Sequence, residues 1–366
     1  MRVLLTGARA PAALELARLC ARAGHTVHVA DTYHWHICRG SRHITGAHVL
    51  PAPRGAPDAY VTAVQTLVEA LQIDVIVPTC EEIFHLAAHR DALGTRIACE
   101  PLSVLGALHD KWRFMTACDA ADVRRPATWL LAHADDLSAL PHGMYIVKPR
   151  YSRFATRVLA WRTGDALPVL DGVHERAWIA QERLIGPSLS TWSVSTRGRL
   201  DAHVTYAVDV TAGPRGAAIA FHTVRHDGVA TWVRQFLAHH RLSGQFAFDF
   251  IDSDAGLMAI ECNPRSTSGI HCLRAMPDVV GTLLDPDATA PTATREPKPE
   301  QYFRSRLALL MYGRTRRPGA GLLDAADDPW PRRLQWIAWT HLLAASACAR
   351  TDPRRWSTRD IEWNGE

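Results

Sequence analysis

The sequence predicts an α/β protein in which a doubly wound parallel sheet is followed by a second, strand-rich domain. Two observations predict this fold class. The first hundred residues alternate short apolar strand runs with helical patterns, and residues 144–264 consist mainly of strand runs. The length of 366 residues allows two or three domains, and a hydrophobic content of 47% is enough for sizeable cores, which excludes a disordered chain.

The chain opens with a β-α-β pattern. Residues 2–6 form an apolar run that ends at Gly7, a helical pattern follows, and residues 26–30 give a second strand. A helix around 58–71 leads to a buried-strand run at 73–79. Gly7 does not belong to a three-glycine dinucleotide fingerprint, which disfavours a nicotinamide-dependent oxidoreductase and leaves Gly7 as the residue of a strand–helix turn.

The segment PTCEE after this strand run admits two interpretations. Thr79 stands three residues before Glu82, which predicts a capping box at the start of the next helix. The alternative is that Glu81 faces a ligand cleft between domains.

A helix beginning at Asp110 and a break at Pro126 lead into the second domain. One further helix is expected at 229–242. The Pro- and Thr-rich stretch 289–299 indicates a linker or surface excursion, and the residues after 300 combine an apolar helix with an aromatic stretch. The strand runs lie at 144–149, 156–161, 178–186, 189–195, 201–210, 218–224, 246–252 and 256–264.

Charge and cysteine content limit the classes of partner. There are 41 Lys+Arg against 37 Asp+Glu, a net charge of +4 without a dense basic run, which gives little support for nucleic-acid binding. No stretch of about 18 apolar residues without charges predicts a membrane span, and the N-terminus does not resemble a secretory signal. The eight cysteines contain no CxxC pair, so reduced thiols in a cytoplasmic protein are expected.

Two segments suggest a nucleotide site. Lys148 ends the strand run MYIVKP, where an ammonium group can reach a phosphate while its stem packs on the sheet; the alternative is a surface lysine. The run AQERLIGPSLS at 180–190 offers a strand edge whose backbone groups match the donor and acceptor of adenine. Its alternative is an ordinary bent strand.

The strongest pattern is a hairpin with acidic residues. Strand alternation places Asp249 on one strand, and Glu261 and Asn263 on the partner strand, on the same face of the sheet. Oxygen ligands converging in this way suit Mg²⁺, which commonly shares its coordination with nucleotide phosphates. The alternative is a hairpin with polar residues facing water, packed through Cys262 and Ile260 on its other side.

The order of lysine, strand edge, aspartate and Glu-x-Asn-Pro-Arg resembles the ATP-grasp superfamily of carboxylate–amine ligases, including biotin carboxylase, carbamoyl phosphate synthetase and D-alanine–D-alanine ligase. The segments DKWRF and VRRPAT are similar to family motifs as well. The resemblance implies a Rossmann-like pre-ATP-grasp domain at 1–105, an ATP-grasp domain at 106–287 with a lid subdomain at about 125–186, and a linker with a C-terminal helical extension at 288–366.

The resemblance also implies roles for the nucleotide-binding residues. Lys111 and Lys148 match the two lysines that bind ATP from opposite sides. Gln181, Glu182 and Leu184 would line the adenine edge, mostly through backbone atoms.

The metal and acid-binding residues follow in the same way. Asp249, Glu261 and Asn263 resemble the ligands of Mg²⁺, with Mn²⁺ as the alternative ion. Arg265 resembles the arginine that holds the acyl phosphate or carboxylate, a task that suits its planar fork.

The lid segment KPRYSRFATRV departs from the family pattern because it contains no glycine. Backbone N–H groups approach phosphates closely only where side chains are small. Arg150, Arg153 and Arg157 could supply guanidinium donors instead, or they could be solvated arginines on a hairpin.

The implied activity is ATP-dependent: a carboxylate is phosphorylated, an amine attacks the acyl phosphate, and ADP and phosphate leave. Small-molecule carboxylate and amine substrates are the implied partners, with a homodimer possible through the C-terminal aromatic stretch and no nucleic acid or membrane. The alternatives are a ligase that uses bicarbonate, of carboxylase or carbamoyl type, and a non-catalytic nucleotide-binding regulator.

Overall fold

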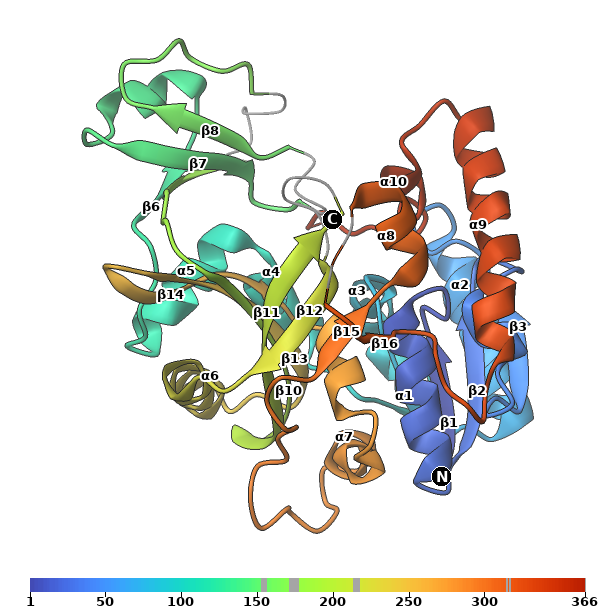
Figure 1. The fold of residues 1–366 in the computed structure, drawn as a ribbon. Helices are drawn as coiled ribbons and strands as arrows, with labels where there is room; N and C mark the ends of the chain where they lie inside the picture. The colour runs from blue at the N-terminus through green and yellow to red at the C-terminus, as the bar shows by residue number, and fades with distance from the viewer. Residues whose placement is uncertain (153–156, 171–177, 213–217, 314, 316, 366) are drawn as a thin grey trace.

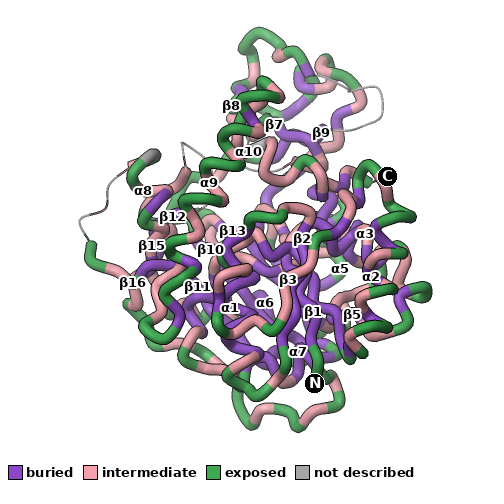
Figure 2. Tube along the Cα trace, turned by 90° about the vertical axis from the view of Figure 1, so that its right-hand side faces the viewer, coloured by how far each residue is buried: buried purple, intermediate pink, exposed green. Residues whose placement is uncertain are grey.

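The computed structural model describes residues 1–152, 157–170, 178–212, 218–313, 315 and 317–365. Within these ranges the strands form sheets of five, seven and four strands. Figure 1 shows the five-stranded sheet in blue beside the central seven-stranded sheet, with the four-stranded sheet standing above the centre. Figure 2 shows that buried residues concentrate in the strands, while exposed residues lie mainly in helices and loops.

The N-terminal sheet is parallel and doubly wound, as predicted, with the strand order β3-β2-β1-β4-β5. Alternate residues of β1 pack on opposite layers: Val3 and Leu5 join the core beneath α1, and Leu4 packs with Tyr60 and Val64 of α2. The elements are β1 (Arg2–Thr6), α1 (Pro11–Arg22), β2 (Thr26–Asp31), β3 (Gly46–Val49), α2 (Pro57–Leu71), β4 (Val75–Val77), α3 (Glu82–Ala88), β5 (Arg96–Ile97) and α4 (Leu102–His109).

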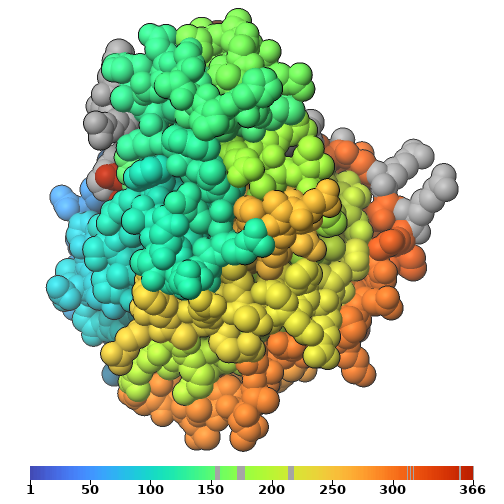
Figure 3. Space-filling model, turned by 90° about the vertical axis from the view of Figure 1, so that its left-hand side faces the viewer, coloured from blue at the N-terminus to red at the C-terminus, as the bar shows by residue number. Residues whose placement is uncertain are grey.

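The four-stranded sheet forms a separate small layer with the order β6-β9-β7-β8. Its own core contains Tyr145, Val147, Trp161 and Trp178. Seen from the side in Figure 3, its residues, drawn in green, form the top of the molecule. The strands are β6 (Thr128–Leu131), β7 (Met144–Pro149), β8 (Leu159–Arg162) and β9 (Trp178–Glu182).

The central sheet has the order β14-β13-β10-β11-β12-β15-β16. One of its faces packs on α5 and α6 through a cluster of aromatic rings that includes Phe114, Trp232, Phe236 and Phe248. The elements are α5 (Lys111–Ala120), β10 (Ser188–Thr196), β11 (Arg199–Thr211), β12 (Ala218–Val224), α6 (Asp227–His240), β13 (Gly244–Ser253) and β14 (Gly256–Asn263).

The C-terminal residues pack across both large sheets. Strand β15 pairs with β12, and Trp363 near the chain end stacks on Phe84 of α3 at 4.7 Å between ring centroids. Among the described helices, none combines the length and apolar character that a bilayer crossing requires. The remaining elements are α7 (Gly281–Leu284), β15 (Tyr302–Arg304), α8 (Arg306–Tyr312), β16 (Ala320–Gly321), α9 (Trp330–Cys348) and α10 (Pro353–Trp356).

Two predicted elements end earlier than the sequence indicates. The strand predicted at 178–186 pairs only as far as Glu182, and the chain then runs through Gly186 and Pro187 before β10. The helix predicted at 229–242 spans 227–240, because Arg241 takes a left-handed conformation with φ of 52°. At its start, the ring of His226 accepts a hydrogen bond from the Val229 N–H at 3.1 Å.

Candidate functional site

The hairpin of β13 and β14 brings the predicted acidic residues together. Asp249 lies directly opposite Glu261, and Ala247 lies opposite Asn263, so the three polar side chains share one face. Phe248 and Cys262 occupy the other face and are buried in the core. The register shifts after Asp249, which leaves Ile260 as an extra residue in β14.

Asp249 lies in a poorly solvated part of this site, whereas the Glu261 side chain is 26% exposed. Burial, together with the nearby negative charge of Glu261, raises the pKa of Asp249 to about 6. The Ser190 hydroxyl donates to Asp249 Oδ1 at 2.6 Å, and Asn263 Nδ2 lies 3.4 Å from Asp249 Oδ2. A cation near these oxygens would relieve the repulsion between the carboxylates.

Two lysines from different elements face this acidic pair. Lys111, the first residue of α5, places its Nζ 3.3 Å from Glu261 Oε1. Lys148, near the end of β7, donates from Nζ to Gln181 Oε1 at 2.9 Å and to the Ile260 carbonyl at 3.3 Å. Burial lowers the pKa of Lys148 to about 8, because the ammonium group has lost most of its water.

These lysines carry a sequence signal that motif reading alone misses. The chain contains only three lysines, Lys111, Lys148 and Lys298, although it is rich in arginine. Two of the three lie beside the acidic hairpin, whereas Lys298 is exposed elsewhere. The overall preference for arginine therefore does not explain why lysine, with its compact ammonium group, occurs at these two positions.

Arg265 lies at the end of the same hairpin. Its Nη2 donates to Asn263 Oδ1 at 3.2 Å, and its Nη1 donates to the Ser266 carbonyl at 3.2 Å. The guanidinium group thus adds a fixed positive charge next to Asn263.

The predicted adenine-edge residues occupy different environments. Gln181 is buried, and its side chain hydrogen-bonds to Lys148 and Thr128, so it positions the Lys148 ammonium group. Glu182 is exposed; its backbone N–H donates to the Ala127 carbonyl, and its Oε2 accepts from the Ala127 N–H. Leu184 is half-buried and lies beyond the end of β9.

Two of the lid arginines have contacts with residues other than the acidic pair. Arg150 pairs with Asp110, whose carboxylate also accepts the backbone N–H of Trp112 at 2.9 Å and so caps α5. The Arg157 guanidinium lies 5.0 Å from the ring centroid of Trp178. Arg153 lies outside the described residues.

The donor set of the hairpin fits a hard divalent cation. It offers two carboxylates and one amide oxygen, from Asp249, Glu261 and Asn263, which are the atoms that Mg²⁺ and Mn²⁺ prefer. No cluster of three or more His, Cys, Asp or Glu side chains suited to a metal occurs in the described part of the chain. The third oxygen of this candidate metal site must therefore come from Asn263.

Sequence reasoning missed Ser190 as a partner of Asp249. Ser190 reaches Asp249 because β10 pairs with β13 in a register that sets the two residues opposite each other. The alternating Ser and Thr residues of the run LSTWSVS are the local signal of a polar strand face, but they do not specify the partner strand.

The capping box predicted at Thr79 and Glu82 forms only in part. Glu82 Oε1 accepts the Thr79 N–H at 3.0 Å, but the Thr79 hydroxyl donates to the Thr6 carbonyl at 2.7 Å instead of capping the helix. Glu81, the alternative ligand-facing residue, is buried.

Comparison with solved structures identifies the fold. N5-carboxyaminoimidazole synthetase from Staphylococcus aureus, complexed with ADP, matches with a TM-score of 0.64 and 14% identity over 82% of this chain and 80% of that chain. The L-amino acid ligase of Bacillus licheniformis matches with a TM-score of 0.62 and 13% identity, covering 78% and 74%. Biotin carboxylase from Campylobacter jejuni matches with a TM-score of 0.61 and 13% identity, covering 77% and 70%.

No protein-family model and no curated protein sequence matches the chain. The solved structures are ATP-grasp enzymes, so this chain has the ATP-grasp fold, and the resemblance seen in the sequence is confirmed at the level of the fold.

Proposed function

We propose that the protein is an ATP-dependent carboxylate–amine ligase that forms an acyl phosphate and condenses it with an amine, releasing ADP and phosphate. The observation that carries the proposal is the position of Lys111 and Lys148 against the carboxylates of Asp249 and Glu261. A site in which ammonium groups face carboxylates suits a nucleoside triphosphate with its divalent cation, because the lysines attract the phosphates and the carboxylates attract the cation.

In this proposal Asp249, Glu261 and Asn263 hold Mg²⁺, which when bound neutralises charge on the nucleotide phosphates. Lys111 and Lys148 bind the phosphates from two sides, and Arg265 holds the carboxylate or acyl phosphate. The chain beyond the end of β9, at Leu184, would bind adenine through backbone atoms, because β9 itself pairs with β6 on one side and β7 on the other. Gln181 instead fixes the Lys148 ammonium group at 2.9 Å.

The chain's own residues contribute by position and charge. Fixed ammonium and guanidinium groups stabilise the charge that develops on the transferred phosphoryl group without reorganising. Holding the acyl phosphate near the amine replaces a bimolecular encounter by an effectively unimolecular step. No protein nucleophile is required.

A bicarbonate-using ligase is the second candidate, because one of the structures with the same fold is a biotin carboxylase. The two candidates differ in the acid that ATP activates. Only the first requires an organic carboxylate for phosphate release.

The test is an assay of the purified protein with ATP, Mg²⁺ and panels of carboxylic acids and amines, scored by phosphate release and product mass. Phosphate release that needs both an acid and an amine supports the proposal. Release that needs bicarbonate alone selects the second candidate, and no release above the Glu261→Gln background with any pair contradicts both.

Three further assignments accompany the proposal. We propose the division into 1–105, 106–287 with a lid at about 125–186, and 288–366, with the first sheet, which ends at Ile97, in the first part and β10, which begins at Ser188, in the second. The segment 288–366 also adds β15 and β16 to the central sheet. The described cysteines are all free thiols, which agrees with the cytoplasm, where ATP and Mg²⁺ are abundant. A homodimer would use the exposed apolar residues of α9, such as Trp336 and Ile337.

A further inference from the structure

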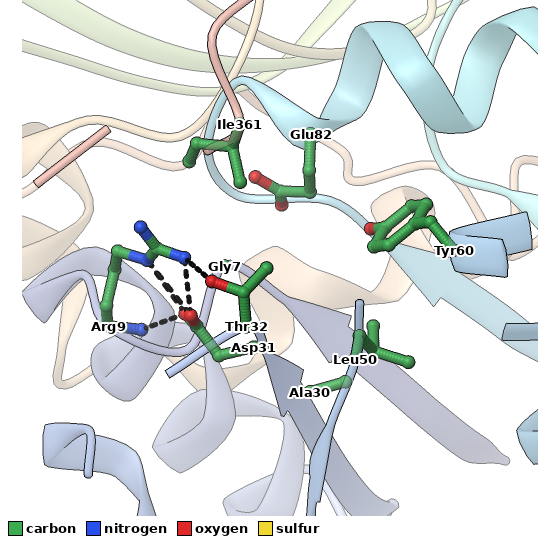
Figure 4. Close-up of a pocket in the computed structure, with 9 residues that line it drawn as sticks. All are labelled: Gly7, Arg9, Ala30, Asp31, Thr32, Leu50, Tyr60, Glu82 and Ile361. Carbon is green, nitrogen blue, oxygen red and sulfur yellow. Dashed lines mark hydrogen bonds and ion pairs between the residues drawn. The ribbon is translucent and has the colours of Figure 1, made fainter. Parts of the chain in front are cut away.

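A second polar site lies at the carboxyl edge of the N-terminal sheet (Figure 4). It is a small pocket between Gly7 after β1, Asp31 at the end of β2, and Glu82 at the start of α3. Because β1 lies between β2 and β4, the strand order reverses at this point, and such switch points are where doubly wound sheets bind ligands. Gly7 has a φ of +72°, and a Cβ there would lie 2.7 Å from Thr79 Oγ1, so this turn requires glycine.

Two oxygen atoms at the pocket have no hydrogen-bond partner among the described residues. They are Tyr60 Oη and Glu82 Oε2, and each residue is only 2% exposed. The other oxygen of Glu82 is fully used: Oε1 accepts from the Thr6 hydroxyl at 2.7 Å and from the backbone N–H groups of Thr79 and Cys80. Buried polar atoms normally have partners, so this pair points to a ligand that supplies them.

The outer wall of the pocket comes from the C-terminal segment 356–365. Ile361 lines the pocket, and the segment is held by Arg9, whose Nη2 lies 2.7 Å from Asp360 Oδ2 and whose Nη1 donates to the Ser357 carbonyl at 2.8 Å. The same guanidinium group pairs with Asp31 at 2.6 Å. Arg9 is therefore already neutralised, and it offers little attraction to an anionic ligand.

The charge of the pocket favours a cation. One guanidinium group, Arg9, pairs with the two carboxylates of Asp31 and Asp360, which leaves a net negative charge beside the Glu82 carboxyl group, whose pKa burial raises. Leu50 and Ile361 add apolar surface beside these groups. A ligand that suits both features carries N–H donors and a positive charge at one end and a short apolar stem at the other.

We propose that this pocket binds the ammonium end of a small primary amine, with Glu82 Oε2 and Tyr60 Oη as its polar partners and Leu50 and Ile361 against its stem. The inference rests on the proposed function, for which it specifies the class of the amine substrate. The segment after β4 that leads to Glu82 contacts the acidic hairpin's strand β13, because Gln245 Nε2 donates to the Pro78 carbonyl at 3.4 Å.

The experiment uses the full chain and ¹³C-methylammonium as the probe, titrated by NMR at constant ionic strength without ATP. Methanol, which has a similar size but no charge, is the comparison ligand. We expect saturable binding of methylammonium and at least tenfold weaker binding of methanol.

Two variants and a matched control test the position of the probe. Tyr60→Phe removes only the unpartnered hydroxyl and should weaken methylammonium binding about threefold to tenfold, the loss of one hydrogen bond. Glu82→Gln keeps an oxygen for Thr6, Thr79 and Cys80 but turns an N–H₂ group toward the pocket, so binding should weaken more than tenfold. Tyr145→Phe removes a buried hydroxyl that donates to the Pro141 carbonyl in the four-stranded sheet and should bind as wild type.

Unfolding midpoints equal to or above that of wild type for Tyr60→Phe would show that the fold is intact, because an unpartnered hydroxyl contributes no stability. Absence of saturable methylammonium binding, or equal binding by all variants, overturns the proposal and leaves a pocket that holds bound water only. Binding without any ATP turnover would reject the proposed ligase function alone. If the rate of amine-dependent ATP turnover is the same in Tyr60→Phe and Glu82→Gln as in wild type, the amine pocket alone is rejected.

Discussion

Lys111 Nζ lies 3.3 Å from Glu261 Oε1, and this contact joins the start of α5 to the acidic hairpin. The lysine is only 1% exposed, so the carboxylate replaces much of the water that its ammonium group has lost. Any ligand that binds Glu261 must therefore share it with Lys111.

The first prediction concerns the acidic hairpin. Glu261→Gln should leave the protein folded and lower Mg²⁺-dependent ATP turnover by roughly a hundredfold or more, because it removes the charge of a metal ligand. Asp249→Asn and Asn263→Ala should act in the same direction. Phosphate release measures the effect, circular dichroism checks the fold, and an unchanged rate in Glu261→Gln would remove this residue from the metal site.

The second prediction concerns Lys148. Lys148→Met keeps the apolar stem and should weaken ATP binding roughly ten- to a hundredfold, the loss of a charge-assisted contact of about 1.5–3 kcal/mol. Stability should not fall, because burial already lowers the pKa of this lysine to about 8. Calorimetric titration with ATP measures the change, and Lys298→Met, at an exposed position, is the control. Equal ATP affinity in both variants would mean that Lys148 only packs on the sheet.

The third prediction separates the lid arginines. Because Asp110 holds Arg150 and also caps α5, Arg150→Ala should cost roughly 1–3 kcal/mol in the free energy of unfolding and should change ATP and AMP affinity to the same extent. Chemical denaturation and calorimetry provide the two readouts, with Arg157→Ala as the comparison. A loss of ATP affinity that spares AMP would instead place the Arg150 guanidinium on the β- and γ-phosphates.

The fourth prediction concerns acid stability. His203 is buried between Ser193 and Thr205, each within 3.0 Å, and burial lowers the pKa of its imidazole to about 3. In the unfolded chain the same ring binds a proton near pH 6.5, so the unfolded state holds more protons between pH 6.5 and 3. Stability should therefore fall across this window as the pH decreases, by on the order of 3–5 kcal/mol from this residue.

His203→Gln should flatten that part of the stability curve, because glutamine can bond to both hydroxyls without titrating. Urea denaturation at a series of pH values measures the slope. Identical slopes for the wild-type protein and the variant would show that other groups cause the acid sensitivity.

Local pattern predicted most of the elements, including the shared face of Asp249, Glu261 and Asn263, because strand alternation and a hairpin of adjacent strands are short-range features. Contacts between distant segments were not predictable in this way. Ser190 meets Asp249 across 59 residues of sequence, through a strand pairing that no local signal specifies. Tyr60 and Glu82 form a pocket only because α2 and α3 meet above the same sheet edge.

The contact of Arg9 with Asp360 spans 351 residues of sequence, so the turn after β1 is completed by a segment far along the chain. Proteins are synthesised from the N-terminus, and domains commonly fold in that order as they emerge. The five-stranded sheet can form early, but Ile361 cannot reach it until the residues between them have been synthesised. A nascent chain that has not yet reached Ile361 therefore carries the Gly7 pocket without its outer wall.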